Sequence, residues 1–216
     1  MTDWRKRLLW AAPLALIVAF LAYEGWAVGS AKARTPAILK QAAERPLALD
    51  SVPKGRVDML LAVEDPGFWR HKGIDFSTPG QGMTNLTQSL VKQLYFEKFK
   101  PGFAKIEQAL IARYVLHPAL SKRDQLEVFL NYASFGRRQG AAVKGFPAAA
   151  RAYYGKDFQA LSEDEYLSLV AMLIGPKLYD PVRQPAANAE RVRRIKKMLA
   201  GQCAPKGLKD VYYEGC

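Results

Sequence analysis

The hydrophobic pattern divides the chain into one long apolar run and a longer region of helical periodicity. Residues 8–28 form the run, and Glu24 is their only charge. About 20 apolar residues span a bilayer core as a helix, so the run predicts a single transmembrane helix. Trp4, Trp10 and Trp26 flank or bracket it, as aromatic residues do at the two membrane interfaces.

Basic residues immediately before the run indicate its orientation. Residues 5–7 read Arg-Lys-Arg, so we expect residues 1–7 to stay in the cytoplasm and the remainder to lie outside. A cleaved signal peptide is the competing interpretation, with residues 31–33, Ala-Lys-Ala, as its cleavage site. The run is longer than a typical signal core, which favours an uncleaved single-pass anchor in the inner (cytoplasmic) membrane with a periplasmic domain.

Residues 29–52 are interpreted as a linker, because prolines interrupt them and their charges are mostly basic. Residues 53–200 then show helical spacing; Leu86, Leu90 and Leu94, for example, recur at i, i+4 and i+8. No convincing strand alternation is present, so the predicted fold class is mostly α. The expected helices are 56–65, 84–95, 101–118, one that starts at the capping pair Ser121 and Asp124, one that starts at the capping box of Ser162 and Glu165, and 191–199.

Composition and cysteine content add further limits. A chain of 216 residues with 50% hydrophobic content can bury one sizeable core. The net charge of +12 suggests nucleic acid, an anionic membrane surface or a phosphorylated substrate as partner, and the apolar run favours the membrane and excludes nucleic acid from our expectation. In the C-terminal tail, residues 201–216, Cys203 and Cys216 predict a disulfide if the domain is extracytoplasmic; two free thiols are the alternative.

The segment 64–73, Glu-Asp-Pro-Gly-Phe-Trp-Arg-His-Lys-Gly, is the strongest candidate for chemistry. Glu64 follows the apolar residues 59–63, and apolar neighbours disfavour the charged form of a carboxylic acid, which raises its pKa. A Glu in this setting can exchange a proton near neutral pH. The simpler interpretation is an acidic pair that only decorates a helix end, and it must be weighed against the segments downstream.

Those downstream segments also place polar side chains in helical settings. Residues 82–93 are rich in hydroxyls and amides at an expected helix start, where free N–H groups and Lys92 can hold a phosphate. Glu107 follows between apolar neighbours, and residues 121–131 and 145–156 continue the series. Each segment alone is more often an ordinary cap or a solvated surface.

In this order the segments resemble the peptidoglycan glycosyltransferases, found as monofunctional transglycosylases and as the first domain of bifunctional penicillin-binding proteins. The resemblance covers roughly residues 55–200. Residues 64–73 match the family's E-D-x-x-F-x-x-H-x-G almost completely, and residues 82–93 match G-x-S-T-x-x-Q-Q-x-x-K-N in part. Residues 122–131 match K-x-x-I-L-E-x-Y-L-N except for Gln125 in place of Ile and Phe129 in place of Tyr, and residues 154–156 fit the Y/F-G-K turn.

The resemblance implies a lysozyme-like domain that polymerises lipid II into glycan strands. It implies Glu64 as the general base, and Glu107 as a second catalytic carboxylate that assists the diphosphate or binds a divalent cation, Mg²⁺ or Mn²⁺. The implied partners are lipid II, the nascent glycan strand, the membrane and cell-wall synthesis proteins with transpeptidase activity. The implied substrate-binding residues are Asp65, Phe68, His71, Thr84, Gln88, Lys92, Lys122, Glu127 and Asn131.

Two departures from the family pattern bear on activity. In the R-K-x-x-E segment, Phe103 stands at the Arg position and Ala104 at the Lys position, so Lys105 or Arg113 would have to supply the charge from elsewhere. The span 75–82 is also short, where relatives carry an extra helix and a loop over the sugar groove.

Three functions are therefore compared. The first is an active glycosyltransferase, the second a non-catalytic envelope scaffold that binds glycan or cell-wall synthesis partners, and the third a lysozyme-like hydrolase with Glu64 as general acid. The order of the motifs favours the synthase over the hydrolase, and Phe103 is the best argument for the scaffold. Because no Ser-x-x-Lys nucleophile occurs in a suitable setting, we expect crosslinking to come from another protein.

Overall fold

The computed structural model describes the backbone of residues 3–216 and the side chains of residues 11–216. Trp4, Trp10 and the basic side chains of residues 5–7 lie outside the described side chains. The cytoplasmic placement of residues 1–7 therefore stays a prediction.

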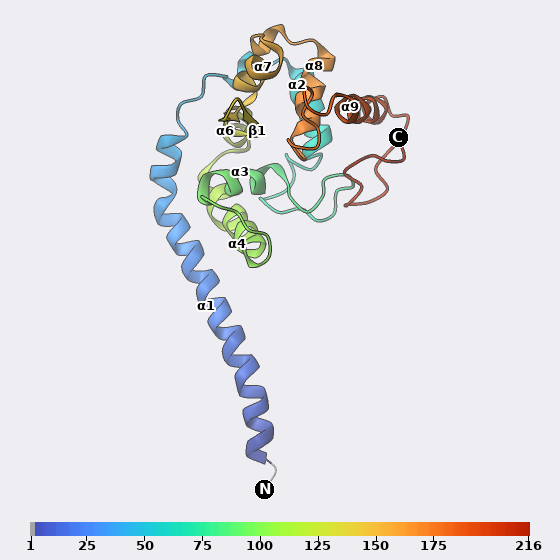
Figure 1. Ribbon diagram of the computed structural model, residues 1–216. Helices are drawn as coiled ribbons and strands as arrows, with labels where there is room; N and C mark the ends of the chain where they lie inside the picture. The colour runs from blue at the N-terminus through green and yellow to red at the C-terminus, as the bar shows by residue number, and fades with distance from the viewer. Residues whose placement is uncertain (1–2) are drawn as a thin grey trace.

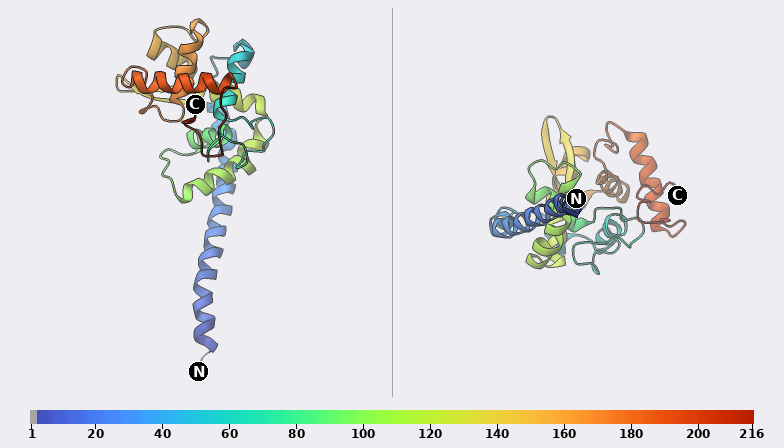
Figure 2. Two further views of the ribbon diagram at one scale, coloured as in Figure 1. Left: turned by 90° about the vertical axis from the view of Figure 1, so that its right-hand side faces the viewer. Right: turned by 90° about the horizontal axis from the view of Figure 1, so that it is seen from below.

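A 39-residue helix, α1 (Asp3–Gln41), projects from the domain at its N-terminal end and packs along it at its C-terminal end (Figures 1 and 2). Its part from Ala11 to Gln41 is long and apolar enough to cross a membrane, by length and composition, with a mean hydropathy of 1.7. Leu16 and Leu21 leave 72% and 61% of their surface exposed. Such a contiguous apolar surface is typical of a helix that faces lipid.

The helix does not end near residue 28, where the apolar run ends. It continues to Gln41, so the first half of the expected linker, residues 29–52, is helical, and Pro36 lies inside the helix. Tertiary packing is the reason. The small side chains Ala31 and Thr35 are buried where α1 contacts the domain, and this burial offsets the one backbone hydrogen bond that proline removes.

The domain after α1 consists of short helices and one two-stranded hairpin, which agrees with a mostly α fold class. The hairpin was not predicted, because its strands have only five and four residues and show no regular alternation of buried and exposed positions. The elements are η1 (Leu49–Ser51), α2 (Lys54–Glu64), α3 (Leu86–Tyr95), α4 (Phe103–Ile111), the π-helical turn η2 (Ala112–Leu116), α5 (His117–Ala119), α6 (Lys122–Tyr132), β1 (Ser134–Arg138), β2 (Ala141–Lys144), α7 (Phe146–Tyr154), η3 (Phe158–Ala160), α8 (Glu163–Met172) and α9 (Pro185–Leu199).

The centre of the core lies around α8, whose residues from Tyr166 to Met172 are all buried. The ring of Tyr166 packs on those of Phe146 and Phe158. Arg56 of α2 donates to the carbonyl of Phe158 at 2.7 Å, and its own carbonyl accepts from the Tyr166 hydroxyl at 2.6 Å. These bonds fix α2 against the core and so fix the position of its last residue, Glu64.

Both capping predictions are confirmed. The Ser121 side chain accepts from the Asp124 amide at the start of α6, and Ser162 forms a reciprocal capping box with Glu165 at the start of α8. The disulfide between Cys203 and Cys216 is also present.

Residues 201–216 pack against the domain. Tyr213 is only 1% exposed, and its hydroxyl donates to the carbonyl of Val63 at 3.0 Å. The C-terminal segment therefore belongs to the same core as α2.

Candidate active site

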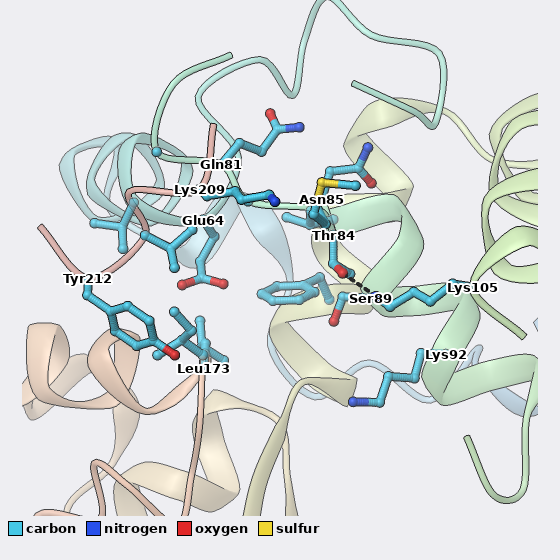
Figure 3. A pocket seen from close by; sticks show the side chains of 18 of the residues that line it. Glu64, Gln81, Thr84, Asn85, Ser89, Lys92, Lys105, Leu173, Lys209 and Tyr212 are labelled. Atoms are coloured by element: carbon cyan, nitrogen blue, oxygen red, sulfur yellow. Dashed lines mark hydrogen bonds between the residues drawn. The ribbon is translucent and has the colours of Figure 1, made fainter. Parts of the chain in front are cut away.

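Glu64 ends α2 and lines a cavity of about 530 Å³, seen in Figure 3. The walls come from α2, from the segment just before α3, from α3 and α4, and from α9 and the residues beyond it, with Phe129 of α6 and Leu173 after α8 completing the lining. Among the described residues that line it, Glu64 is the only carboxylate. The cationic side chains of the lining are Lys92, Lys105, Arg191 and Lys209.

The carboxyl group of Glu64 is poised for proton exchange. Burial raises its pKa from 4.5 to about 7; the charge of Arg191 opposes this rise and the charge of Asp65 adds to it. Arg191 stays beside it because its guanidinium donates to the Val211 carbonyl at 2.9 Å and lies over the ring of Tyr213. A carboxyl group with this pKa is present in both protonation states near neutral pH, as a general base requires.

Two lysines line another part of the cavity wall. Lys92 comes from the last turn of α3 and Lys105 from α4, and their ammonium groups lie 5.7 and 5.6 Å from the ring centroid of Phe99. Lys105 Nζ donates to Thr84 Oγ1 at 2.5 Å. Burial and then the neighbouring charge of Lys92 lower the pKa of Lys105. Two ammonium groups that repel one another form a ready site for a multiply charged anion such as a diphosphate.

Asp65 lies in the interior and is not part of the cavity lining. Its carboxylate accepts from the Leu86 amide at 3.0 Å, at the start of α3, and contacts His71 Nε2 at 2.9 Å. Because His71 Nδ1 accepts from the Gly73 amide, the ring proton sits on Nε2 and points at Asp65. Asp65 thereby ties the end of α2 to the start of α3.

Lys122 and Phe68 lie next to the contact between Asp65 and His71. Lys122 Nζ is 4.2 Å from the ring centroid of Phe68 and 3.4 Å from His71 Nδ1. Burial lowers the pKa of Lys122 to about 8, and the charge of Asp65 partly offsets this. None of Phe68, His71 and Lys122 lines the cavity.

Gln88 supports the start of α3 and does not line the cavity. Its side chain accepts from the Asn85 amide in the capping box of α3, and its carbonyl accepts from Gln108 Nε2 at 2.7 Å. Asn85, its partner in the capping box, does line the cavity.

Glu127 and Asn131 lie on α6 and bind the chain that enters the domain after α1. Glu127 accepts from the Leu49 amide at 2.9 Å, and Asn131 exchanges two hydrogen bonds with the backbone of Leu47. Both are outside the cavity lining, and their contacts fix how residues 45–49 cross α6.

Glu107 does not line the cavity either. It lies on α4, which packs against α1, near enough to Glu24 for the two carboxylates to interact. If the R-K-x-x-E pattern is moved by one residue, its Lys falls on Lys105, which does line the cavity, and its Glu falls on the buried amide Gln108.

In the described residues, no group of three or more His, Cys, Asp or Glu side chains could hold a metal ion. The residues present do not fit a protein-held divalent cation.

Of the predicted site residues, the structure thus brings together Glu64, Thr84 and Lys92 in one cavity. Four further residues line the cavity that the motifs did not indicate as site residues: Arg191, Lys209, Ser89 and Gln81. Ser89 lies within a recognised motif, and its place on the same side of α3 as Lys92 was a usable signal. For Arg191 and Lys209 no sequence signal was present, because both approach Glu64 only through the packing of α9 and the C-terminal segment.

A helical domain whose cationic cavity holds a carboxyl group that can exchange protons near pH 7 is the arrangement of an enzyme that acts on an anionic substrate. A family model described as Transglycosylase matches residues 32–200. The chain is 32% identical to penicillin-binding protein 1B of Escherichia coli (strain K12) over 159 residues, which make up 68% of this chain and 19% of that protein. It is 30% identical to the biosynthetic peptidoglycan transglycosylase of Nitrosospira multiformis, over 68% of this chain and 67% of that protein.

The chain belongs to the transglycosylase family, the peptidoglycan glycosyltransferases, as its motifs indicated. It spans about a fifth of the length of the penicillin-binding proteins that it matches, such as penicillin-binding protein 1F of Bacillus subtilis (strain 168), 30% identical over 23% of that protein.

Proposed function

We propose that the protein polymerises lipid II into glycan strands, with Glu64 as the general base. In the reaction, the Glu64 carboxylate takes the proton of the sugar 4-hydroxyl of lipid II as its oxygen bonds to the anomeric carbon of the donor strand. The bond from that carbon to the diphosphate breaks, and the polyprenyl diphosphate leaves with the electron pair. Lys92 and Lys105 stabilise the charge that develops on this leaving group.

One observation carries the proposal: Glu64, the one carboxylate among the described lining residues, has a pKa of about 7 and shares the cavity with four cationic side chains. A general base needs the first feature, and an anionic diphosphate leaving group needs the second. A hydrolase of neutral glycan links would use the carboxylate but has no use for the lysines.

The position of Phe103 weakens the argument for a scaffold, which rested on the loss of the motif's Arg at this position. Phe103 is 75% exposed, and its ring lies 5.7 Å from that of Phe20 on α1, outside the cavity lining. The loss of a cation at position 103 therefore takes no charge from the cavity, and Lys105 supplies one there. A divalent cation is no part of the proposed steps, because the side chains around the cavity do not form a site for it.

We also propose that α1 anchors the protein in the inner membrane, with the domain on the periplasmic side. Lipid II and the growing strand are membrane-bound, so an anchored enzyme meets both at the membrane surface. We propose lipid II, the growing strand and cell-wall synthesis proteins with transpeptidase activity as its partners.

The test is polymerisation of labelled lipid II by the purified full-length protein in detergent, with and without Mg²⁺. We expect polymer from the parent and from the control Glu97→Gln, whose side chain is exposed and outside the cavity. We expect none from Glu64→Gln. Bound lipid II without polymer in the parent would support the scaffold, and shortened glycan from preformed strands would support the hydrolase.

A further inference from the structure

We propose that residues 201–216 form a disulfide-held wall of the substrate cavity, and that Lys209 on this wall binds an anionic oxygen group of the lipid-linked substrate. The inference rests on the proposed function and adds a substrate-binding residue to it. The family model ends at residue 200, so the family match assigns no role to this segment.

The segment is hydrogen-bonded to the short stretch that precedes α3. The Gly80 amide donates to the Gly207 carbonyl at 3.0 Å, and the Gly82 amide donates to the Leu208 carbonyl at 2.7 Å. Both Gly80 and Gly82 have positive φ angles, +78° and +74°. A Cβ atom at Gly82 would lie 2.8 Å from Val211 Cγ1, so the close approach of the two segments depends on glycine.

Two further contacts fix the segment close to the catalytic carboxylate. The Tyr213 hydroxyl donates to the carbonyl of Val63, the residue before Glu64. Arg191, which lies beside Glu64, donates to the Val211 carbonyl. The disulfide between Cys203 and Cys216 closes the loop that carries these groups. A segment held at both ends and at its middle acts as a wall and not as a frayed tail.

The wall presents Lys209, Val211 and Tyr212 to the cavity. Figure 3 shows Lys209 on the same side as Glu64, with its ammonium turned toward Thr84 and Asn85, whereas Lys92 and Lys105 lie across the cavity. Since Lys92 and Lys105 already provide two charges for the leaving group, Lys209 is placed to bind a second anionic group on the side of the base. Two groups of the acceptor lipid II are anionic in this way: its own diphosphate and the carboxylates of its peptide.

Equilibrium binding of fluorescent lipid II to the full-length protein tests the role of Lys209, in the Glu64→Gln background so that no turnover occurs. Lys209→Ala is expected to raise the Kd about fivefold to tenfold, as the loss of one charge-assisted hydrogen bond at a solvent-exposed site does. Lys209→Arg is expected to restore binding. Lys206→Ala is the matched control, because Lys206 lies in the same loop but outside the cavity lining, and it should bind like the parent.

The same titration with polyprenyl diphosphate identifies the group that is bound. A similar loss of affinity in Lys209→Ala assigns the contact to a diphosphate, and a loss confined to lipid II assigns it to a peptide carboxylate. Equal Kd values for Lys209→Ala and Lys206→Ala with both ligands would overturn the role of Lys209. Because the readout is binding, this result is distinct from a parent that binds lipid II but forms no polymer, which would refute the proposed function alone.

The wall itself is tested by releasing it. We expect the double variant Cys203→Ser/Cys216→Ser to lose affinity for lipid II to the same extent as Lys209→Ala and to be cut by trypsin after Lys206 or Lys209. Gly82→Ala, which forces the wall away without removing the disulfide, is expected to do the same and covers the case in which the serine variants do not fold. Unchanged affinity in a folded Gly82→Ala protein would show that the segment is no part of the substrate site.

Discussion

Replacement of Glu64 by Gln should stabilise the folded protein at alkaline pH although it abolishes activity. The pKa of Glu64 is about 7 in the folded protein and 4.5 as its ordinary value. The folded state therefore binds this proton more tightly than the unfolded state. The contribution to stability is fully present below pH 4.5 and is lost as the pH rises through 7.

The size of the effect follows from this difference. At 1.36 kcal/mol for each pH unit, the gap from 4.5 to about 7 corresponds to about 3 kcal/mol of lost stability at pH 8. Glu64 is partly exposed to the water of the cavity, which screens its charge, so we expect about 1–3 kcal/mol. Gln has nearly the same shape and no charge, so Glu64→Gln removes this cost.

Thermal unfolding of the parent and of Glu64→Gln in detergent, followed by intrinsic fluorescence, measures the difference. We expect Glu64→Gln to have the higher Tm at pH 8, and the gap to close at pH 4.5, where the parent carboxyl is protonated. The exposed variant Glu97→Gln should show no such change between the two pH values. A gap that is absent at pH 8, or equally large at pH 4.5, would show that Glu64 is not held in a desolvated site.

Three further outcomes follow from the site. The kcat/KM for lipid II should fall about tenfold per pH unit below pH 7, because the base must be deprotonated, and a flat profile down to pH 5.5 would exclude Glu64 from that role. Glu107→Gln should polymerise lipid II within about twofold of the parent rate, since Glu107 is outside the cavity lining; a loss of ~10²-fold or more would restore it as a catalytic carboxylate. Tyr213→Phe should lower the free energy of unfolding by about 1–2 kcal/mol, because it leaves the Val63 carbonyl unpaired. Tyr212→Phe should leave this free energy unchanged, and equal denaturant midpoints for the two variants would contradict the prediction.

The sequence predicted the helical class, the capping residues and the disulfide, because each depends on short-range patterns. The helix starts at Ser121 and Ser162 follow from side chains that bond amides three residues later. The motif around Glu64 predicted a carboxylate with a raised pKa, and burial at the end of α2 produces it.

Other features depend on contacts between distant segments and gave no local signal. Pro36 indicated a break, yet α1 continues through it because the helix is packed against the domain. Asp65 and His71 belong to the most complete motif, but their side chains bind one another in the interior and do not line the cavity. The motif pattern identified which residues matter to the fold and did not separate those that face the cavity from those that support it.

Glu64 and Asp65 are neighbours, yet one carboxylate opens to the cavity and the other holds the first amide of α3. Lys92 lies in the last turn of the same helix. The base and the cation therefore belong to one rigid piece, and their separation cannot change without breaking buried hydrogen bonds. In the proposed polymerisation, the base and the cation stay at this fixed separation, so the growing strand must move relative to them by one repeat after each bond is made.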